Sequence, residues 1–314
     1  MRLSRHTGQT GSATIVALIV VSLVAMCVTT LIWQQNFAIR KLEIYKSSTQ
    51  VFWLQHSLID VIRLVLRIDV QNDPNIDHLG EIWALPLENS KVQDYLKTEE
   101  LPEDLKRVQF SGSIQDAQSM FNIANLWDAS MTVPNLDSIK IYTQLLQQIG
   151  IDSSLAEQTV KHVINSNSKP QFLDDLLNIP GYTPEIINLL SPFVILLPEP
   201  TTINMNTVSL EVFKALFPLF STSEAEKFML LRTNTPLKSL TDLNQVFGSI
   251  HPNQASPLNS MIDVKSNYFL AHTAVRIDKR NISSRTLIKR FFTPQVDRSY
   301  TSVIWTRQKT VQVE

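Results

Sequence analysis

The chain has 314 residues, of which 44% are hydrophobic and 18% are charged, and its formal net charge is −1. These values predict a globular chain with one large domain or two modest ones, and they exclude wholesale disorder. Because the chain has a single cysteine, Cys27, an intramolecular disulfide and a metal site built from several thiolates are excluded.

Charge is unevenly distributed along the chain. Residues 51–150 contain 7 Lys and Arg against 14 Asp and Glu, whereas residues 251–314 contain 10 against 4. A basic C-terminal segment suits an acidic partner, the acidic middle of the same molecule or nucleic acid. The nearly neutral total favours the contact within the molecule.

The first predicted element is an apolar helix. Ala13 to Trp33 carries no charge, and about 20 apolar residues are enough to cross a membrane. The segment is longer than the apolar region of a cleaved secretory signal, which has roughly 7–15 residues, so we expect it to be retained. Arg2 and Arg5 precede it, which predicts a cytoplasmic N-terminus and places the rest of the chain across the membrane.

The helix is predicted to continue beyond the membrane. Neither Gly nor Pro occurs from Ser12 to Asp73, and apolar residues recur at spacings of three and four after residue 50. An unbroken helix of about 57 residues, roughly 85 Å long, follows from this pattern. Its first half is apolar on all sides and its second half has one apolar face.

An acidic loop and a strand follow the helix. Asp69, Asp73 and Asp77 could supply oxygen ligands to a cation, although a solvated loop is the favoured interpretation. The alternation of polar and apolar residues after Arg107 then predicts a half-buried strand.

Residues 134–250 are predicted to be helical. Six stretches carry apolar stripes, and several of them begin with an N-cap or a first-turn proline, as at Thr183 and Pro184. One stretch, "LLNIPGYTPEII", resembles half of a helix-hairpin-helix, a module that often binds DNA. A single glycine, Gly181, a count of 2 basic against 6 acidic residues in 151–200, and the absence of flanking Lys or Arg favour a scaffold without nucleic acid.

The C-terminal part is predicted to form two or three strands. A turn at Asp278 to Asn281 would join the first two as a hairpin. Five basic residues are expected on the solvent face of this sheet: Arg276, Lys279, Arg280, Lys289 and Arg290. No pairing of nucleophile and base is indicated by spacing, because the six histidines are scattered and no Gly-x-Ser-x-Gly or phosphate loop occurs, so we expect no enzyme.

The N-terminus "QTGSATIV" and the long helix together resemble type IV pilins and pseudopilins. The resemblance implies that prepilin peptidase cuts between Gly11 and Ser12 and that the new N-terminus is methylated. Most members have Phe at the first mature position and Glu at the fifth, where this chain has Ser12 and Val16. In lacking this Glu, the chain resembles the minor pseudopilins of the general secretion pathway protein K family. The resemblance implies a place at the tip of the fibre.

Two internal motifs extend the resemblance to the K family. Trp83 and Pro86 match a Trp-x-x-Pro-Leu segment. The pattern Asp-x-x-Gly-x-Phe-Asn-x-Asn is matched by Asp116, Phe121, Asn122 and Asn125, with Ser119 replacing its glycine. Two roles stay open for the aspartate and asparagines, the capping of backbone groups, which is favoured, and ligand binding.

Calcium is implied by the family, but the sequence supports no confident metal site. The family's acidic loop corresponds to "KHVINSNSKP", in which Asn165 and Asn167 replace carboxylates. Neutral amides give up most of the charge on which calcium affinity depends, so this site is expected to be lost or weak. No other cofactor is expected.

The resemblance implies an α+β fold in which the N-terminal helix packs on a small antiparallel sheet interrupted by a large all-α insert, similar to SAM or helix-hairpin-helix domains. The expected parts are a leader (1–11), a transmembrane helix (12–34), the helix extension with the first part of the sheet (35–126), the insert (127–255) and the closing strands (256–314).

The function implied by the resemblance is that of a non-enzymatic minor pseudopilin. It would initiate or cap the type II secretion pseudopilus while folded proteins are exported across the outer membrane. The implied partners are the I and J pseudopilins, the rest of the pseudopilus, the inner-membrane platform and prepilin peptidase, with no nucleic acid. We expect a single pass through the bacterial inner membrane and a periplasmic C-terminal domain. The alternatives are a membrane-anchored DNA-uptake protein and a minor pilin of a type IV pilus.

Overall fold

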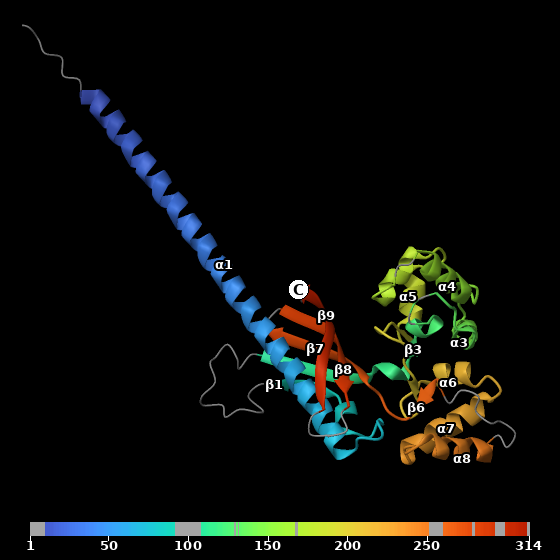
Figure 1. Cartoon of the computed structure of the whole chain (residues 1–314). Coiled ribbons are helices and arrows are strands. Elements are labelled where there is room, and N and C mark those ends of the chain that lie inside the picture. Colours follow the sequence, from blue (N-terminus) through green and yellow to red (C-terminus); the bar gives the residue numbers. More distant parts are fainter. Residues whose placement is uncertain are drawn as a thin grey trace, which may run out of the picture. The chain divides into compact units, whose positions relative to one another are not determined.

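The computed structural model describes residues 10–91, 108–128, 130, 132–166, 169–250, 260–277, 280–292 and 299–312. The chain divides into two compact units, Met1–Leu54 and Gln55–Glu314. A long helix, the first strands of an antiparallel sheet, a helical segment and the remaining strands of that sheet follow one another along the chain (Figure 1), so the predicted α+β fold is confirmed.

Helix α1 (Thr10–Asn72) has 63 residues without a break, as the absence of Gly and Pro after Ser12 predicts. Its segment Ala13–Leu42 contains an 18-residue window with a mean hydropathy of 2.9, and it is long enough to cross a membrane. The large apolar side chains of this stretch are exposed, for example Leu18, Met26 and Trp33. Such a stretch is stable in lipid or among similar helices, because in water it would leave a large apolar surface uncovered.

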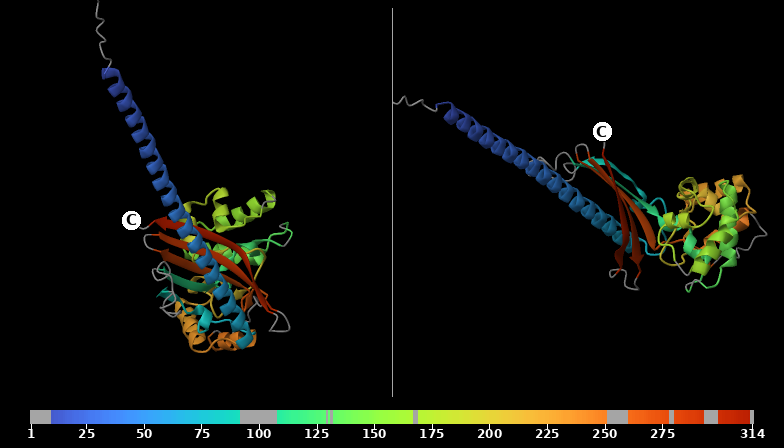
Figure 2. Two further views of the ribbon diagram at one scale, coloured as in Figure 1. Left: turned by 90° about the vertical axis from the view of Figure 1, so that its left-hand side faces the viewer. Right: turned by 90° about the horizontal axis from the view of Figure 1, so that it is seen from above.

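One antiparallel sheet forms the centre of the second unit (Figures 1 and 2). Its strands lie in the order β1 (Leu87–Lys91), β2 (Val108–Asp116), β7 (Tyr268–Ile277), β8 (Arg280–Phe291) and β9 (Tyr300–Gln312). Strands β2 and β7 are neighbours, with Ile114 opposite Ala271, although the helical segment separates them in sequence. The chain therefore leaves the sheet after β2, forms the helical segment and returns to the sheet at β7.

The two faces of the sheet are covered by different elements. The last turns of α1 pack on one face through Ile62 and Leu66, which contact a buried cluster of Trp83, Phe269, Ala271 and Ile288. On the opposite face, Leu270 and Leu287 pack against side chains from outside the sheet, namely Ala117, Met120, Ile195 and Leu197. This second cluster joins the sheet to the helical segment.

Strand β9 changes the face on which its odd-numbered residues lie. Leu287 pairs with Trp305 and Ile288 with Val303, so Ile304 is an extra residue, or bulge, in β9. Before the bulge, Thr301 pairs with Arg290 and faces α1, whereas after it Arg307 pairs with Arg285 and faces away from α1. A single inserted residue thus divides β9 into two halves with opposite alternation.

The helical segment contains α3 (Leu136–Gln148), α4 (Leu155–Ser166), α5 (Pro184–Leu190), α6 (Leu210–Leu216), α7 (Thr222–Asn234) and α8 (Leu240–Ile250). Three details differ from the predicted helices. The stretch 171–179 forms the 3₁₀ helix η6 (Leu173–Asn178), whereas the apolar residues after Phe193 include strand β4 (Val194–Ile195). Helix α8 lies within the range 134–250 that is predicted to be helical, but outside the six stretches with apolar stripes.

Short parallel bridges and an aromatic cluster hold this segment together. Strand β4 pairs with β3 (Phe121–Asn122), and β5 (Ile203–Asn204) pairs with β6 (Ile262–Asp263). Phe213 lies at the centre of the core, with its ring stacked on Phe228 at a centroid distance of 4.6 Å. Each fully buried aromatic side chain of this kind contributes roughly 1.5–3 kcal/mol through the hydrophobic effect.

Gly181 closes the turn between η6 and α5 in a conformation that favours glycine. Its φ is +97°, and an added Cβ would lie 2.7 Å from Cδ2 of Leu155 on α4. The side chain of Thr183 caps the helix that follows. Gly181 is therefore explained by backbone geometry and by the close approach of α4.

We predict that Gly181→Ala lowers the free energy of unfolding by roughly 2–4 kcal/mol, because left-handed strain of about 1–2 kcal/mol adds to overpacking of similar size. Gly150→Ala is the matched control, because Gly150 has a φ of +75° but nothing within 4 Å of the added Cβ. Chemical denaturation of the full chain in non-ionic detergent measures both. Equal losses in the two variants would contradict the packing argument.

Candidate functional site

Arg290 is buried beneath the end of α1, with a side chain only 2% exposed. The prediction that it lies on the solvent face of the sheet is therefore wrong. Successive residues of a strand point to opposite faces, so Lys289 and Arg290 cannot share a face. Arg290 points to the α1 side, while Lys289 lies on the other side and bonds Glu199.

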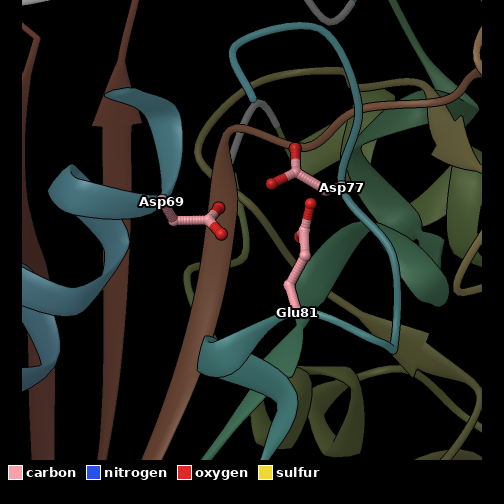
Figure 3. A group of neighbouring side chains, drawn as sticks. All are labelled: Asp69, Asp77 and Glu81. Atoms are coloured by element: carbon pink, nitrogen blue, oxygen red, sulfur yellow. The ribbon is translucent and has the colours of Figure 1, made fainter. Parts of the chain in front are cut away.

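Three carboxyl groups converge beside Arg290 (Figure 3). Asp69 comes from the last turn of α1, Asp77 from the following loop and Glu81 from the start of the 3₁₀ helix η1 (Ile82–Ala84). One oxygen from each lies within 4.8 Å of the others. Asp73, the other acidic residue of this loop, is exposed and accepts a hydrogen bond from the Asn75 amide.

The guanidinium of Arg290 joins α1, the loop and the sheet. It pairs with Asp69 at 2.9 Å and with Asp77, and it donates a hydrogen bond of 2.9 Å to the Ser266 carbonyl. Its carbon lies 4.6 Å from the centroid of the Phe269 ring. Because each contact belongs to a different stretch of chain, one side chain fixes where α1 ends on the sheet.

Burial raises the pKa of two of these carboxyl groups, so that they bind protons near neutral pH. It raises the pKa of Glu81 to about 7, and this carboxyl accepts a hydrogen bond of 2.5 Å from the Trp83 indole. Burial and the neighbouring Glu81 raise the pKa of Asp69 to about 7 as well, against the opposing effect of Arg290. Three acidic groups share one arginine, so part of their negative charge is removed by protons.

The same three carboxyl groups are the one set of possible metal ligands found among the described residues. Carboxylate oxygens are the ligands that calcium and magnesium prefer. These carboxyl groups do not fit such an ion, however, because the guanidinium of Arg290 already pairs with Asp69 and Asp77 and would repel a metal cation.

Asp116 is the centre of a second buried network, at the point where the chain leaves β2 for the helical segment. Its carboxylate accepts hydrogen bonds from the Asn204 amide at 2.9 Å, the Ser266 hydroxyl at 2.7 Å and the Thr207 hydroxyl at 2.5 Å. It also caps the 3₁₀ helix η4 (Ala117–Ser119) by accepting from the Gln118 amide. Burial raises the pKa of Asp116 to about 6, although these donors favour its charged form.

The Arg290 cluster and the Asp116 network share residues. Asp77 accepts a hydrogen bond from the Ser266 amide, and its carbonyl accepts another from the Asn204 side chain. We call this connected set, made of Asp69, Asp77, Asp116, Asn204, Ser266 and Arg290, the polar junction. It ties α1, β2, β7, β8 and the start of the helical segment to one point.

The remaining motif residues lie beside the polar junction. Asn122 caps the 3₁₀ helix η5 (Ile123–Leu126) and accepts from the Leu197 amide, while Asn125 bonds the amide and carbonyl of Thr201. Phe121 is buried and stacks on Tyr142 at 5.3 Å. The Ser119 hydroxyl, which replaces the expected glycine, donates to the Asp116 carbonyl. These bonds hold two distant loops together.

The other predicted residues are spread along the molecule. Trp83 is buried against Phe269, with their ring centroids 5.2 Å apart, and Pro86 follows η1. Gly11 and Ser12 fall in the first turns of α1, and Val16 is exposed in its apolar part. Asn165 is exposed at the end of α4, and Asn167 lies outside the described residues.

Two members of the polar junction, and one carboxyl group beside Arg290, are not indicated by the sequence. Asn204 and Ser266 occur in short polar stretches without a recognisable spacing, and Glu81 stands next to the Trp83 motif without being singled out. One signal was available for Arg290, because alternation along a strand requires one of two adjacent basic residues to face inward.

Comparison with known proteins gives a consistent result. No protein-family model matches the chain. The type II secretion system protein K of Pseudomonas aeruginosa is 27% identical over 318 residues, covering 89% of this chain and 89% of the relative. The protein K of Aeromonas hydrophila is 22% identical, covering 86% and 89%, and that of Pectobacterium carotovorum is 21% identical, covering 89% and 92%.

The chain belongs to the type II secretion protein K family. A chain in the crystal structure of the GspK–GspI–GspJ complex from enterotoxigenic Escherichia coli shares its fold, with a TM-score of 0.67 at 16% identity, covering 86% of this chain and 99% of that one. Members of the K family are minor pseudopilins, which are structural components of the secretion system. The apolar N-terminal helix fits an inner-membrane anchor.

We predict that Arg290→Gln destabilises the K-family chain by about 3–5 kcal/mol, because it leaves Asp77 buried without its positive partner. Adding Asp77→Asn removes the stranded charge, so the double variant should recover part of the loss. Arg63→Gln is the control, because Arg63 is half exposed and bonds Thr301 and Asp60 at the surface. Urea unfolding in detergent measures all three. A loss below about 1 kcal/mol for Arg290→Gln would refute its role.

The raised pKa values predict that stability falls as pH increases from about 4.5 to about 7. Glu81 and Asp69 keep their protons to higher pH in the folded chain than in the unfolded chain, so the folded state binds more protons in this window. The midpoint of thermal unfolding should be higher at pH 5 than at pH 8. Glu81→Gln should reduce this difference, and a pH profile unchanged in that variant would contradict the assignment.

Proposed function

We propose that this chain is the tip subunit of a type II secretion pseudopilus. In this proposal, prepilin peptidase removes residues 1–11 after Gly11 and the new N-terminus at Ser12 is methylated. The mature subunit is held in the inner membrane by α1 with its C-terminal part in the periplasm. It starts or caps the fibre while folded proteins are exported.

The observation that carries the proposal is Val16, which replaces the usual glutamate in a helix that otherwise has the features of a pseudopilin. A buried glutamate in a bundle of apolar helices is stable only if a positive group, such as the N-terminal amine of a neighbouring subunit, lies close to it. Val16 is exposed and apolar. A subunit with valine here needs no neighbour above it, which suits a terminal position.

The helical segment supports the same position. It leaves the sheet between β2 and β7 and contains α3 to α8, so the chain carries far more structure than the sheet alone requires. We propose that residues 127–255 form an inserted domain and that residues 256–314 complete the sheet. A bulky insert would prevent another subunit from adding beyond this one.

The partners that we propose are the I and J pseudopilins of the same system. The related structure is a complex whose three subunits are GspK, GspI and GspJ. The inner-membrane platform and prepilin peptidase would be further partners. We propose no catalytic activity, and a DNA-uptake role is not favoured, because the relatives are secretion proteins and Gly181 is explained by packing.

We predict that Gly11→Leu blocks processing in cells with active prepilin peptidase, because the enzyme needs a small residue before the cut. Gly8→Leu, three residues upstream in the same leader, should be processed normally. N-terminal sequencing and mass spectrometry of the membrane-extracted protein would show Ser12, methylated, as the first residue only when cleavage occurs.

The same samples test assembly. The processed full chain should co-purify with the I and J subunits of its own operon, whereas the Gly11→Leu protein should not. Correct processing of Gly11→Leu would refute the maturation step. Failure of the processed chain to bind I and J would refute its place at the tip.

A further inference from the structure

A groove of about 890 Å³ lies on the sheet face that is turned away from α1. Its floor is formed by β2, β7, β8 and β9, and its wall by η6 and α5 of the helical segment. The volume falls within the range of roughly 300–1,000 Å³ that is typical of ligand sites. None of the groove's basic residues belongs to the polar junction.

A row of basic side chains crosses the floor. His272 on β7 lies opposite Arg285 on β8, and Arg285 lies opposite Arg307 on β9. Lys309 follows Arg307 on the same face. Like charges directly across a ladder destabilise a sheet, so this row has an unfavourable energy in the free protein. An anionic partner would remove that penalty.

The charges of the groove do not balance. The ionised residues that line it are three cations, Arg285, Arg307 and Lys309, and one anion, Asp174. Asp174 pairs with Arg307 at 2.7 Å, and the Arg307 guanidinium also lies over the Phe172 ring. The guanidinium of Arg285 has no hydrogen bond or ion pair to any other residue that the structure describes. Burial and the neighbouring Arg285 lower the pKa of His272, which reflects the positive potential here.

Apolar and aromatic side chains lie beside the basic row. Trp305 and Phe172 meet edge to face, with centroids 5.8 Å apart, and Met120, Leu173 and Ile187 complete this side of the groove. A ligand that fits both parts carries carboxylates next to apolar side chains. Nucleic acid fits less well, because Asp174 would oppose a phosphate backbone and few cations are available.

We propose that this groove binds an extended acidic segment of a partner protein, with a carboxylate paired to Arg285 and an adjacent apolar side chain packed on Trp305 and Phe172. The arginine fork suits a carboxylate, because two parallel hydrogen bonds can form. The site goes beyond assembly of the tip and does not depend on cleavage at Gly11 or on Val16.

The test uses the full chain in non-ionic detergent and a fluorescein-labelled peptide, Gly-Glu-Leu-Glu-Leu-Glu-Gly, followed by fluorescence anisotropy. We expect salt-sensitive binding that is at least about tenfold weaker for Arg285→Gln, because one charged pair is lost. Asp174→Asn should bind more tightly, because it removes the opposing carboxylate. Arg67→Gln is the matched control, since Arg67 is exposed on α1 away from the groove.

Four outcomes would overturn the proposal. They are no binding at protein concentrations up to roughly 0.1 mM, equal binding by the wild type and Arg285→Gln, equal binding of a peptide with Gln in place of Glu, and tighter Arg285-dependent binding of a labelled oligothymidylate. The last would assign the groove to nucleic acid. Unchanged thermal unfolding of the variants would show that the differences arise at the groove.

Discussion

The pairing of Arg290 with Asp69 and Asp77 is the constraint on which the rest of the second unit depends. A buried guanidinium is stable only when its charge is matched by nearby carboxylates, so the partners have few alternative positions. Two of these partners are carboxylates at the end of α1 and in the loop after it, and a third is the carbonyl of Ser266 at the entry to β7. The end of α1, the sheet and the return of the chain from the helical segment are therefore fixed together.

The polar junction also explains how a small sheet can carry a large helical segment. Asp116 stands at the exit from β2, and Ser266 stands just before β7, so one network controls both places where the chain crosses between the two structures. Asn204 adds a bond from within the helical segment itself. Apolar packing of Ile195 and Leu197 on Leu270 and Leu287 then covers the adjacent surface. Directional polar contacts set the position, and burial of apolar surface supplies most of the stability.

The fold could be predicted from local signals, whereas the polar junction could not. Continuous helix from Ser12 follows from the absence of Gly and Pro, and the C-terminal strands follow from their alternation. The apolar spacing after Leu173 suits both a 3₁₀ helix and an α-helix, and the apolar run that contains β4 suits either a strand or a helix. The sequence therefore predicts the wrong element at both places. Asn204, Ser266 and Arg290 meet only in three dimensions, so their spacing in sequence carries no signal. The same holds for Arg285 and Arg307, which become neighbours through strand register.

The bulge at Ile304 has a consequence for how this chain can change during evolution. The bulge reverses the alternation of side chains along β9, because odd-numbered residues before it face α1 and odd-numbered residues after it face the groove. A one-residue insertion or deletion within β9 would turn one half of the strand over, bringing Trp305, Arg307 and Lys309 under α1 or moving Thr301 out of reach of Arg63. A change in the length of β9 therefore affects both the surface that packs on α1 and the surface of the groove. Substitutions can alter one of these surfaces separately only while the length of the strand is kept.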